Sequence, residues 1–197
     1  MKKRHFLASA SLASVAGVLT PGAASARPAG RPGPGLLTVS GDIGRANRGP
    51  VDAALDQMLS KHGVRFDKAM VFDDAALQRL PAVRIRPTLE YDAKQHTLVG
   101  PLLASVLQAA GVAPDSAVTV TLRAADGYTV PITLADARAL RMIVATELDG
   151  RALALGGLGP QWALVEADVL PGLKDKPLKE RFAQCPWALY SIEVKRG

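Results

Sequence analysis

The spacing of hydrophobic residues changes along the chain and predicts where strands and helices lie. Between residues 117 and 123 the hydrophobic residues alternate with others, a period typical of a strand with one buried face. In "GPLLASVLQAAGV", at 100–112, they instead recur every three or four positions, which predicts a helix with Pro101 in its first turn and Gly111 at its end. We expect the buried stripe of this helix to be Leu102, Leu103, Val106, Leu107 and Ala110.

The same reasoning predicts the other elements of the chain. Further strands are expected at 36–41, 82–91, 141–148, 151–155, 160–167 and 187–194, and further helices at 51–63, 73–80 and 133–139. One face of the first of these helices is expected to carry Val51, Leu55, Met58 and Leu59, and one face of the last strand Ala188, Tyr190, Ile192 and Val194. Strands and short helices are mixed without the regular alternation of a doubly wound sheet, so the sequence predicts the α+β class.

Cap and turn residues predict several of the boundaries. Asp73 or Asp74 is expected to cap the helix that follows it, and Thr133 the helix after it, because their side-chain oxygens can accept hydrogen bonds from free backbone N–H groups. The pairs Asp126-Gly127 and Asp149-Gly150 predict hairpin turns, because glycine tolerates the positive φ that such turns require.

The first 26 residues have the three parts of an export signal. They are basic residues at 2–4, an apolar run at 6–20 and small residues at 24–26. The apolar run is too short and too often interrupted by serine for a membrane span of roughly 20 residues. We therefore expect cleavage after Ala26, no transmembrane span in the mature chain, and a periplasmic or secreted protein.

Cleavage changes what the composition implies. The Pro/Gly-rich stretch at 27–35 is expected to be a linker, and residues 36–197 one domain, since 171 mature residues suffice for a single core. Without the three basic residues of the signal, 21 Lys and Arg stand against 18 Asp and Glu, a net charge of +3 instead of +6. That mild excess does not indicate nucleic-acid binding. The only cysteine, Cys185, cannot form an internal disulfide.

Few side chains have the spacing of a catalytic or metal site. After cleavage only His62 and His96 remain as histidines, and neither has neighbours with the spacing of metal ligands. The serines show no nucleophile-elbow pattern. In the loop "GDIGRANRG", Arg45, Asn47 and Arg48 offer charge-assisted hydrogen bonds to an anionic ligand, and the alternative is a solvated loop.

Six stretches together resemble one family. "LLTVSGDI", "HTLVGPLLASVLQAAGV", "LRAADGYTVPITLADA", "IVATELDGRALAL", "GLGPQWALVEA" and "WALYSIEV" occur in the order seen in small exported proteins similar to the molybdopterin-binding domain of the sulfite oxidase family. The resemblance covers about residues 36–195, and it is carried by the order and spacing of the stretches. It implies the α+β sulfite oxidase fold, with mixed β-sheets and short helices.

The resemblance does not extend to the metal ligand of the catalytic members. In those members a cysteine thiolate on the segment before the "GPLL"-like helix binds molybdenum, but the corresponding residues 80–97 contain no cysteine. Cys185 lies instead just before the last strand, so we expect a partly buried, chemically dispensable residue. The basic residue that often precedes the "GP" of the glycine-rich loop is replaced by Leu158, which weakens the case for binding a pterin phosphate.

The fold resemblance also implies where a ligand would bind. It brings "GPLL", "ADGY" and "GLGPQW" together, so that Gly100, Tyr128, Gly159 and Trp162 become ligand contacts; the alternative is that they only pack the core. No catalytic residue, metal ligand or cofactor is expected. We expect a non-catalytic module that binds a small ligand or a periplasmic protein, and the alternative is a molybdopterin-dependent oxidoreductase without cysteine ligation.

Overall fold

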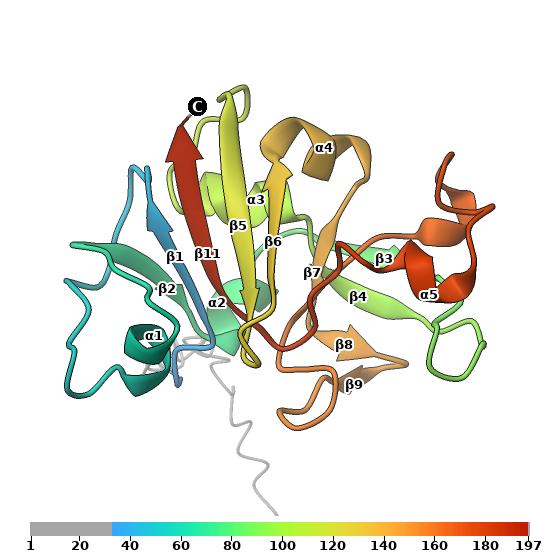
Figure 1. The fold of residues 1–197 in the computed structure, drawn as a ribbon, viewed down its shortest axis with the longest axis horizontal. Coiled ribbons are helices and arrows are strands. Elements are labelled where there is room, and N and C mark those ends of the chain that lie inside the picture. The colour runs from blue at the N-terminus through green and yellow to red at the C-terminus, as the bar shows by residue number, and fades with distance from the viewer. Residues whose placement is uncertain (1–32, 197) are drawn as a thin grey trace, which may run out of the picture. The chain divides into compact units, whose positions relative to one another are not determined.

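A five-stranded sheet in the order β2-β1-β11-β5-β6 organises the fold (Figure 1). The computed structural model describes residues 33–196; the predicted signal peptide and linker residues 27–32 lie outside the described residues. The strands of this sheet are β1 Leu37–Gly41, β2 Ala69–Phe72, β5 Val118–Ala124, β6 Thr129–Thr133 and β11 Leu189–Arg196.

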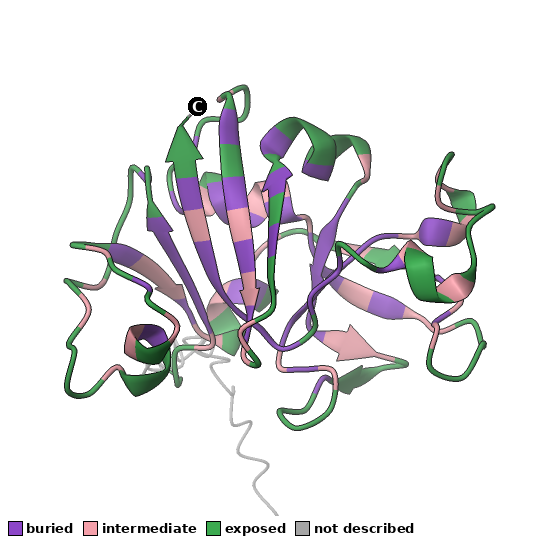
Figure 2. Ribbon diagram, in the orientation of Figure 1, coloured by how far each residue is buried: buried purple, intermediate pink, exposed green. Residues whose placement is uncertain are grey.

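The C-terminal strand β11 is the central strand of this sheet. It pairs in parallel with β1, the first described strand, and antiparallel with β5. Because β11 has a neighbour on each side and is covered on both faces, Leu189, Tyr190, Ser191 and Ile192 are all buried. Figure 2 shows buried residues along β1 and β11 and exposed ones in the loops around α1.

Two smaller sheets and several short helices complete the described part of the chain. The first sheet has the order β3-β4-β8-β9, and the second pairs β10 with β7. The strands are β3 Ala82–Ile85, β4 Leu98–Pro101, β7 Ile143–Ala145, β8 Glu147–Leu148, β9 Arg151–Ala152 and β10 Trp162–Leu164. The helices are α1 Gln57–Lys61, α2 Asp74–Gln78, α3 Leu103–Ala109, α4 Leu134–Ala139, α5 Leu178–Arg181 and the 3₁₀ helix η1 Ala167–Val169. The fold is therefore mixed α+β, as predicted.

Helices and turns that depend on local signals form where the sequence predicts them. Asp73 accepts a hydrogen bond from the backbone N–H of Ala76 at the start of α2, and the Thr133 hydroxyl accepts one from Asp136 at the start of α4. The β8–β9 hairpin turns at Asp149-Gly150, with φ values of 49° and 76°. These predictions are confirmed. Caps and tight turns can be predicted from the sequence because residues only a few positions apart decide them.

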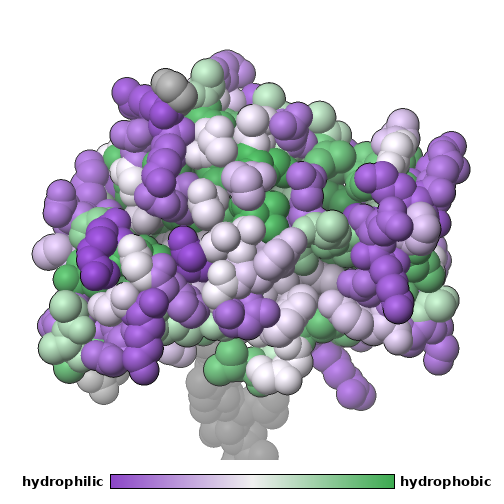
Figure 3. Space-filling view, viewed as in Figure 1, coloured by the Kyte–Doolittle hydropathy of each residue, from purple (hydrophilic) through white to green (hydrophobic). Residues whose placement is uncertain are grey.

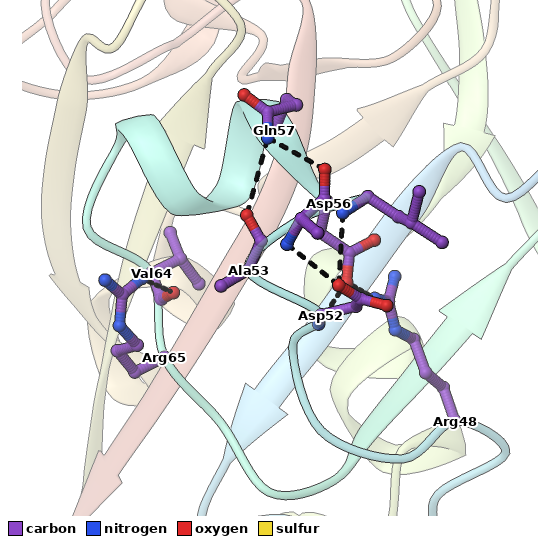
Figure 4. A network of polar contacts seen from close by, with 9 residues as sticks. Arg48, Asp52, Ala53, Asp56, Gln57, Val64 and Arg65 are labelled. Atoms are coloured by element: carbon purple, nitrogen blue, oxygen red, sulfur yellow. Dashed lines mark hydrogen bonds and ion pairs between the residues drawn. The ribbon is translucent and has the colours of Figure 1, made fainter.

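The predicted helix at 51–63 is wrong over its first half. Only α1 forms, Leu59 is buried, and Leu55 and Met58 are 82% and 44% exposed. The Asp52 carboxylate accepts hydrogen bonds from the backbone N–H groups of residues 54 and 55, while Asp56 accepts from the N–H of Asp52 and pairs with Arg48 (Figure 4). These side chains offer the backbone an alternative to helical hydrogen bonds, so the chain turns before the helix begins.

Several predicted strands differ in detail. The strands predicted at 82–91, 151–155 and 160–167 form only over Ala82–Ile85, Arg151–Ala152 and Trp162–Leu164. The single strand expected at 141–148 is split at Thr146 into β7 and β8, which belong to different sheets. In β11, the pairing with β5 shifts register between Leu189 and Ser191. The alternation predicted that Tyr190 and Ile192 share one face of the strand. Because of the shift, Tyr190 packs instead in a small cluster with Leu59 and Val64, while Ile192 lies in the main core.

The surface of the described residues is mixed in character. Figure 3 shows hydrophilic residues over most of one face, with hydrophobic residues visible between them. None of the helices in residues 33–196 is both long and apolar enough to span a membrane.

Candidate functional site

Two of the predicted ligand contacts, Gly100 and Trp162, lie in the core against strand β7. A Cβ added at Gly100 would lie 2.0 Å from the carbonyl oxygen of Val144, so glycine is needed where β4 crosses β7. Trp162 pairs with Ala145 of the same strand and is 1% exposed. The structure therefore brings these two residues together, with protein covering both.

The other two predicted contacts, Gly159 and Tyr128, lie on loops near the start of β11. Gly159 is buried, and a Cβ there would lie 2.5 Å from the carbonyl oxygen of Leu153. Tyr128, on the β5–β6 hairpin, is 51% exposed, and its hydroxyl donates to the carbonyl oxygen of Ala183 at 2.7 Å. Of the four predicted contacts, Tyr128 is the one with substantial surface open to a ligand.

Two of the three polar candidates on the loop before residue 51, Arg45 and Asn47, contact a different part of the fold. The Asn47 amide exchanges two hydrogen bonds with the backbone of Val71, at 2.7 and 2.8 Å, and so extends the edge of β2. Arg45 donates its backbone N–H to Ala110 at the end of α3, and its side chain is exposed, without a hydrogen bond or ion pair in the described part of the chain. Arg48, the third residue of the anion-binding prediction, forms an ion pair with Asp56. Of the three residues, Arg45 alone keeps a guanidinium that is free within the described residues, because the Asn47 amide is bound to the backbone of β2.

The lone thiol is buried on a residue whose backbone contacts a group of aromatic rings. Cys185 is 5% exposed, and its carbonyl oxygen accepts a hydrogen bond from the indole of Trp162 at 2.9 Å. The Phe182 and Tyr91 rings lie 6.4 and 6.2 Å from the Trp162 ring. Desolvation by burial raises the pKa of the Cys185 thiol to about 12, so the thiol is neutral at ordinary pH.

Histidine and carboxylate side chains meet at one exposed place. His96 lies 2.7 Å from a carboxylate oxygen of Asp149 and 2.9 Å from one of Asp92. Hydrogen bonds to Asp149 and then to Asp92 raise the pKa of His96, and the bonds from His96 lower the pKa of both carboxyl groups. Both imidazole nitrogens are occupied by carboxylates, so this cluster is an ion-pair network. In residues 33–196 no group of three or more ligand-type side chains is arranged to hold a metal ion.

The His96 network has a defined pH window. Because the pKa of His96 is raised, its contribution to stability is fully present below the unfolded value of about 6.5 and is lost as pH rises through the folded value. Because the pKa values of Asp92 and Asp149 are lowered, their contributions are present above the unfolded value of about 3.9 and are lost at lower pH. The network is strongest between these limits.

Two cavities are both lined in part by the buried residue Met142. One, of about 310 Å³, lies between α3 and α4 and is lined by hydrophobic residues and by Arg138 and Arg141. The other, also about 310 Å³, is lined by Cys185 and by residues of the loop before β11, including Arg181. Arg181 is already engaged there, since it donates to Asp168 and to a backbone carbonyl at 2.8 Å each.

Sequence reasoning missed the cavity between α3 and α4. No sequence signal marked it, because Arg141 lies beyond the predicted helix at 133–139, at the start of a predicted strand. Its place at the cavity follows from the turn after α4. Comparison with known proteins adds no assignment: no family model matches the chain, and no curated protein is significantly similar to it.

Proposed function

We propose that this protein is a non-catalytic binding module with the molybdopterin-binding fold of the sulfite oxidase family, acting on a small ligand or a protein partner. The α+β architecture supports this proposal at the level of class. The six stretches that resemble the family coincide with β1, the β4–α3 unit, the β5–β6–α4 unit, β7 to β9, β10 and β11. The resemblance thus falls on the elements that build the core.

The state of Cys185 is the observation that carries the non-catalytic part of the proposal. A thiol ligand must be deprotonated and reach the metal, whereas this thiol is buried and has a pKa of about 12. Residues 80–97, where the resemblance puts the ligand, offer no thiol in its place. The residues present therefore do not fit a thiolate-bound molybdenum centre.

The proposed place of action is the periplasm or the exterior of the cell. This part rests on the basic, apolar and small-residue pattern of residues 1–26. Intact mass of the exported protein tests it. A mass that begins at Arg27 is expected, and a cytoplasmic protein that retains Met1 contradicts it.

Metal analysis of protein purified from molybdenum-replete cells tests the function. We expect no stoichiometric molybdenum in the wild type or in Cys185→Ser, because the thiol takes no part in ligation. Thiol labelling provides the matched measurement: Cys185 should label slowly in the native state and fast in urea. One molybdenum per chain, retained or lost in Cys185→Ser, contradicts the proposal, and retention would favour an oxidoreductase without cysteine ligation.

A further inference from the structure

Helices α3 and α4 end in the same backbone motif but with different residues. After α3, the N–H groups of Gly111 and Val112 donate to the carbonyls of Gln108 and Leu107, and Gly111 has a φ of 86°. After α4, residues 141 and 142 donate to residues 138 and 137 in the same way, but the left-handed position is held by Arg141, with a φ of 49°. Glycine is the usual residue at this position because a Cβ disfavours it.

The turn after α4 places Arg141 at the rim of the cavity between the two helices. Hydrophobic residues line this cavity, including Leu102, Leu107, Val112, Leu134, Ala137 and Met142. The polar residues of the lining are Ser105, Gln108, Arg138 and Arg141, and no acidic residue is among them. A cavity of about 310 Å³ lies at the lower end of the range of small-molecule sites, roughly 300–1,000 Å³, which suits a small ligand.

The two arginines of the lining differ in how far they are engaged. Arg138 donates to the carbonyl oxygen of Pro114 at 2.7 Å and lies 3.3 Å from Asp115, a residue whose side chain is 97% exposed. The Arg141 guanidinium has no hydrogen bond or ion pair among residues 33–196. Its positive charge is therefore available to a ligand, and no neighbouring carboxylate of the lining neutralises it.

We infer that the cavity between α3 and α4 binds a small amphiphilic carboxylate, whose apolar body fills the cavity and whose carboxylate pairs with Arg141 at the rim. An apolar lining with a few polar groups at one place is the usual composition of a small-molecule site. The planar guanidinium matches a carboxylate in a bidentate pair, and Arg138 adds positive charge to the same lining.

This inference rests on the proposed function, because it names a ligand class for a binding module. The two can still fail separately. Molybdenum analysis decides whether the domain is non-catalytic, whereas ligand titration decides what the cavity binds. A domain that holds molybdenum and binds the acid would refute only the former, and a metal-free domain that ignores the acid would refute only the latter.

Calorimetric titration of the purified protein with octanoate tests the inference. Octanol, which has the same apolar body without the charge, and acetate, which has the charge without the body, are the matched ligands. Octanoate should bind at least tenfold more tightly than either, because both the apolar contact and the charge-assisted pair are needed.

Three variants locate the binding. Arg141→Gln should weaken octanoate binding roughly tenfold or more, since a charged hydrogen-bonded pair is lost. Ala104→Phe, which fills the cavity from α3, should weaken it as well. Arg151→Gln on β9, an exposed arginine outside the cavity, is the matched control and should bind like the wild type.

The affinity of Arg141→Gln decides whether the inference holds, because this variant changes only an exposed side chain. Ala104→Phe is less decisive, since it can disturb the packing of α3. Equal affinity of octanol and octanoate, unchanged binding by Arg141→Gln, or no heat from millimolar octanoate at two temperatures about 20 °C apart would overturn the inference, since apolar burial changes the heat capacity. Size-exclusion chromatography supplies the last outcome: a wild-type dimer that Ala104→Phe converts to a monomer would show that a second copy covers the cavity.

Discussion

Replacing Arg141 by glycine is expected to stabilise the fold while removing the ligand contact. Arg141 occupies a left-handed position, with a φ of 49°, at the end of α4. The equivalent position at the end of α3 is Gly111, with a φ of 86° and the same pair of closing hydrogen bonds. The end of α3 thus serves as a reference within the same chain, with glycine at the position that Arg141 holds after α4.

The size of the effect follows from two opposing contributions. A residue with a Cβ loses about 1–2 kcal/mol in the left-handed region, and removing that Cβ recovers this free energy. Glycine also makes the unfolded chain more flexible, which lowers the free energy of unfolding by about 0.4–1 kcal/mol. The net gain lies between about 0 and 1.6 kcal/mol. Its middle value of about 0.8 kcal/mol corresponds to a rise in melting temperature of about 2–3 °C for a domain of this size.

Thermal and urea unfolding of Arg141→Gly measure this gain. The matched control is Ala135→Gly, an exposed position within α4, which should lower the free energy of unfolding by about 0.5–1 kcal/mol. Octanoate binding should be lost from Arg141→Gly at the same time. A lower melting temperature for Arg141→Gly than for the wild type would refute the left-handed conformation, and with it the comparison of the two helix ends.

Three further predictions concern stability. Gly127→Val and Gly150→Val should each lower the free energy of unfolding by roughly 1 kcal/mol or more, because both glycines have a positive φ; unchanged melting temperatures would exclude these turns. Gly100→Ala should cost about 1–3 kcal/mol or more through its clash with strand β7, and an unchanged urea midpoint would show that β4 and β7 can separate. His96→Gln should destabilise most between about pH 4 and 6.5 and least in alkaline solution; a pH-independent loss in urea titrations would contradict the ion-pair network.

The sequence predicts the elements of this fold where the deciding residues are neighbours. Thr133 caps α4 through a residue three positions away, and the Asp149-Gly150 turn needs only its own backbone preference. The helix predicted at 51–63 fails for a different reason. The Asp56 carboxylate pairs with Arg48, eight residues earlier, and the spacing of hydrophobic residues does not reveal such a contact between polar side chains.

The sheet to which a strand belongs is harder to predict from a single sequence than the strand itself. Residues 141–148 read as one continuous strand, yet the break at Thr146 sends β7 to β10 and β8 to β4. Nothing within the eight residues marks the break, because the break depends on which strands, distant in the sequence, pair with each half. The register shift in β11 is similar, since an extra residue can be accommodated only against a particular partner strand.

Candidate site residues pose a harder problem, because one residue type serves both packing and binding. Gly100 and Trp162 belong to stretches that suggest a ligand cleft, but a glycine is equally required where two backbones touch, and a tryptophan where a core needs volume. Arg141, by contrast, stands in the sequence as the first residue of a predicted strand and attracts no notice. Its meaning comes from the backbone: an exposed arginine holds a position that the neighbouring helix fills with glycine, beside a cavity without acidic residues.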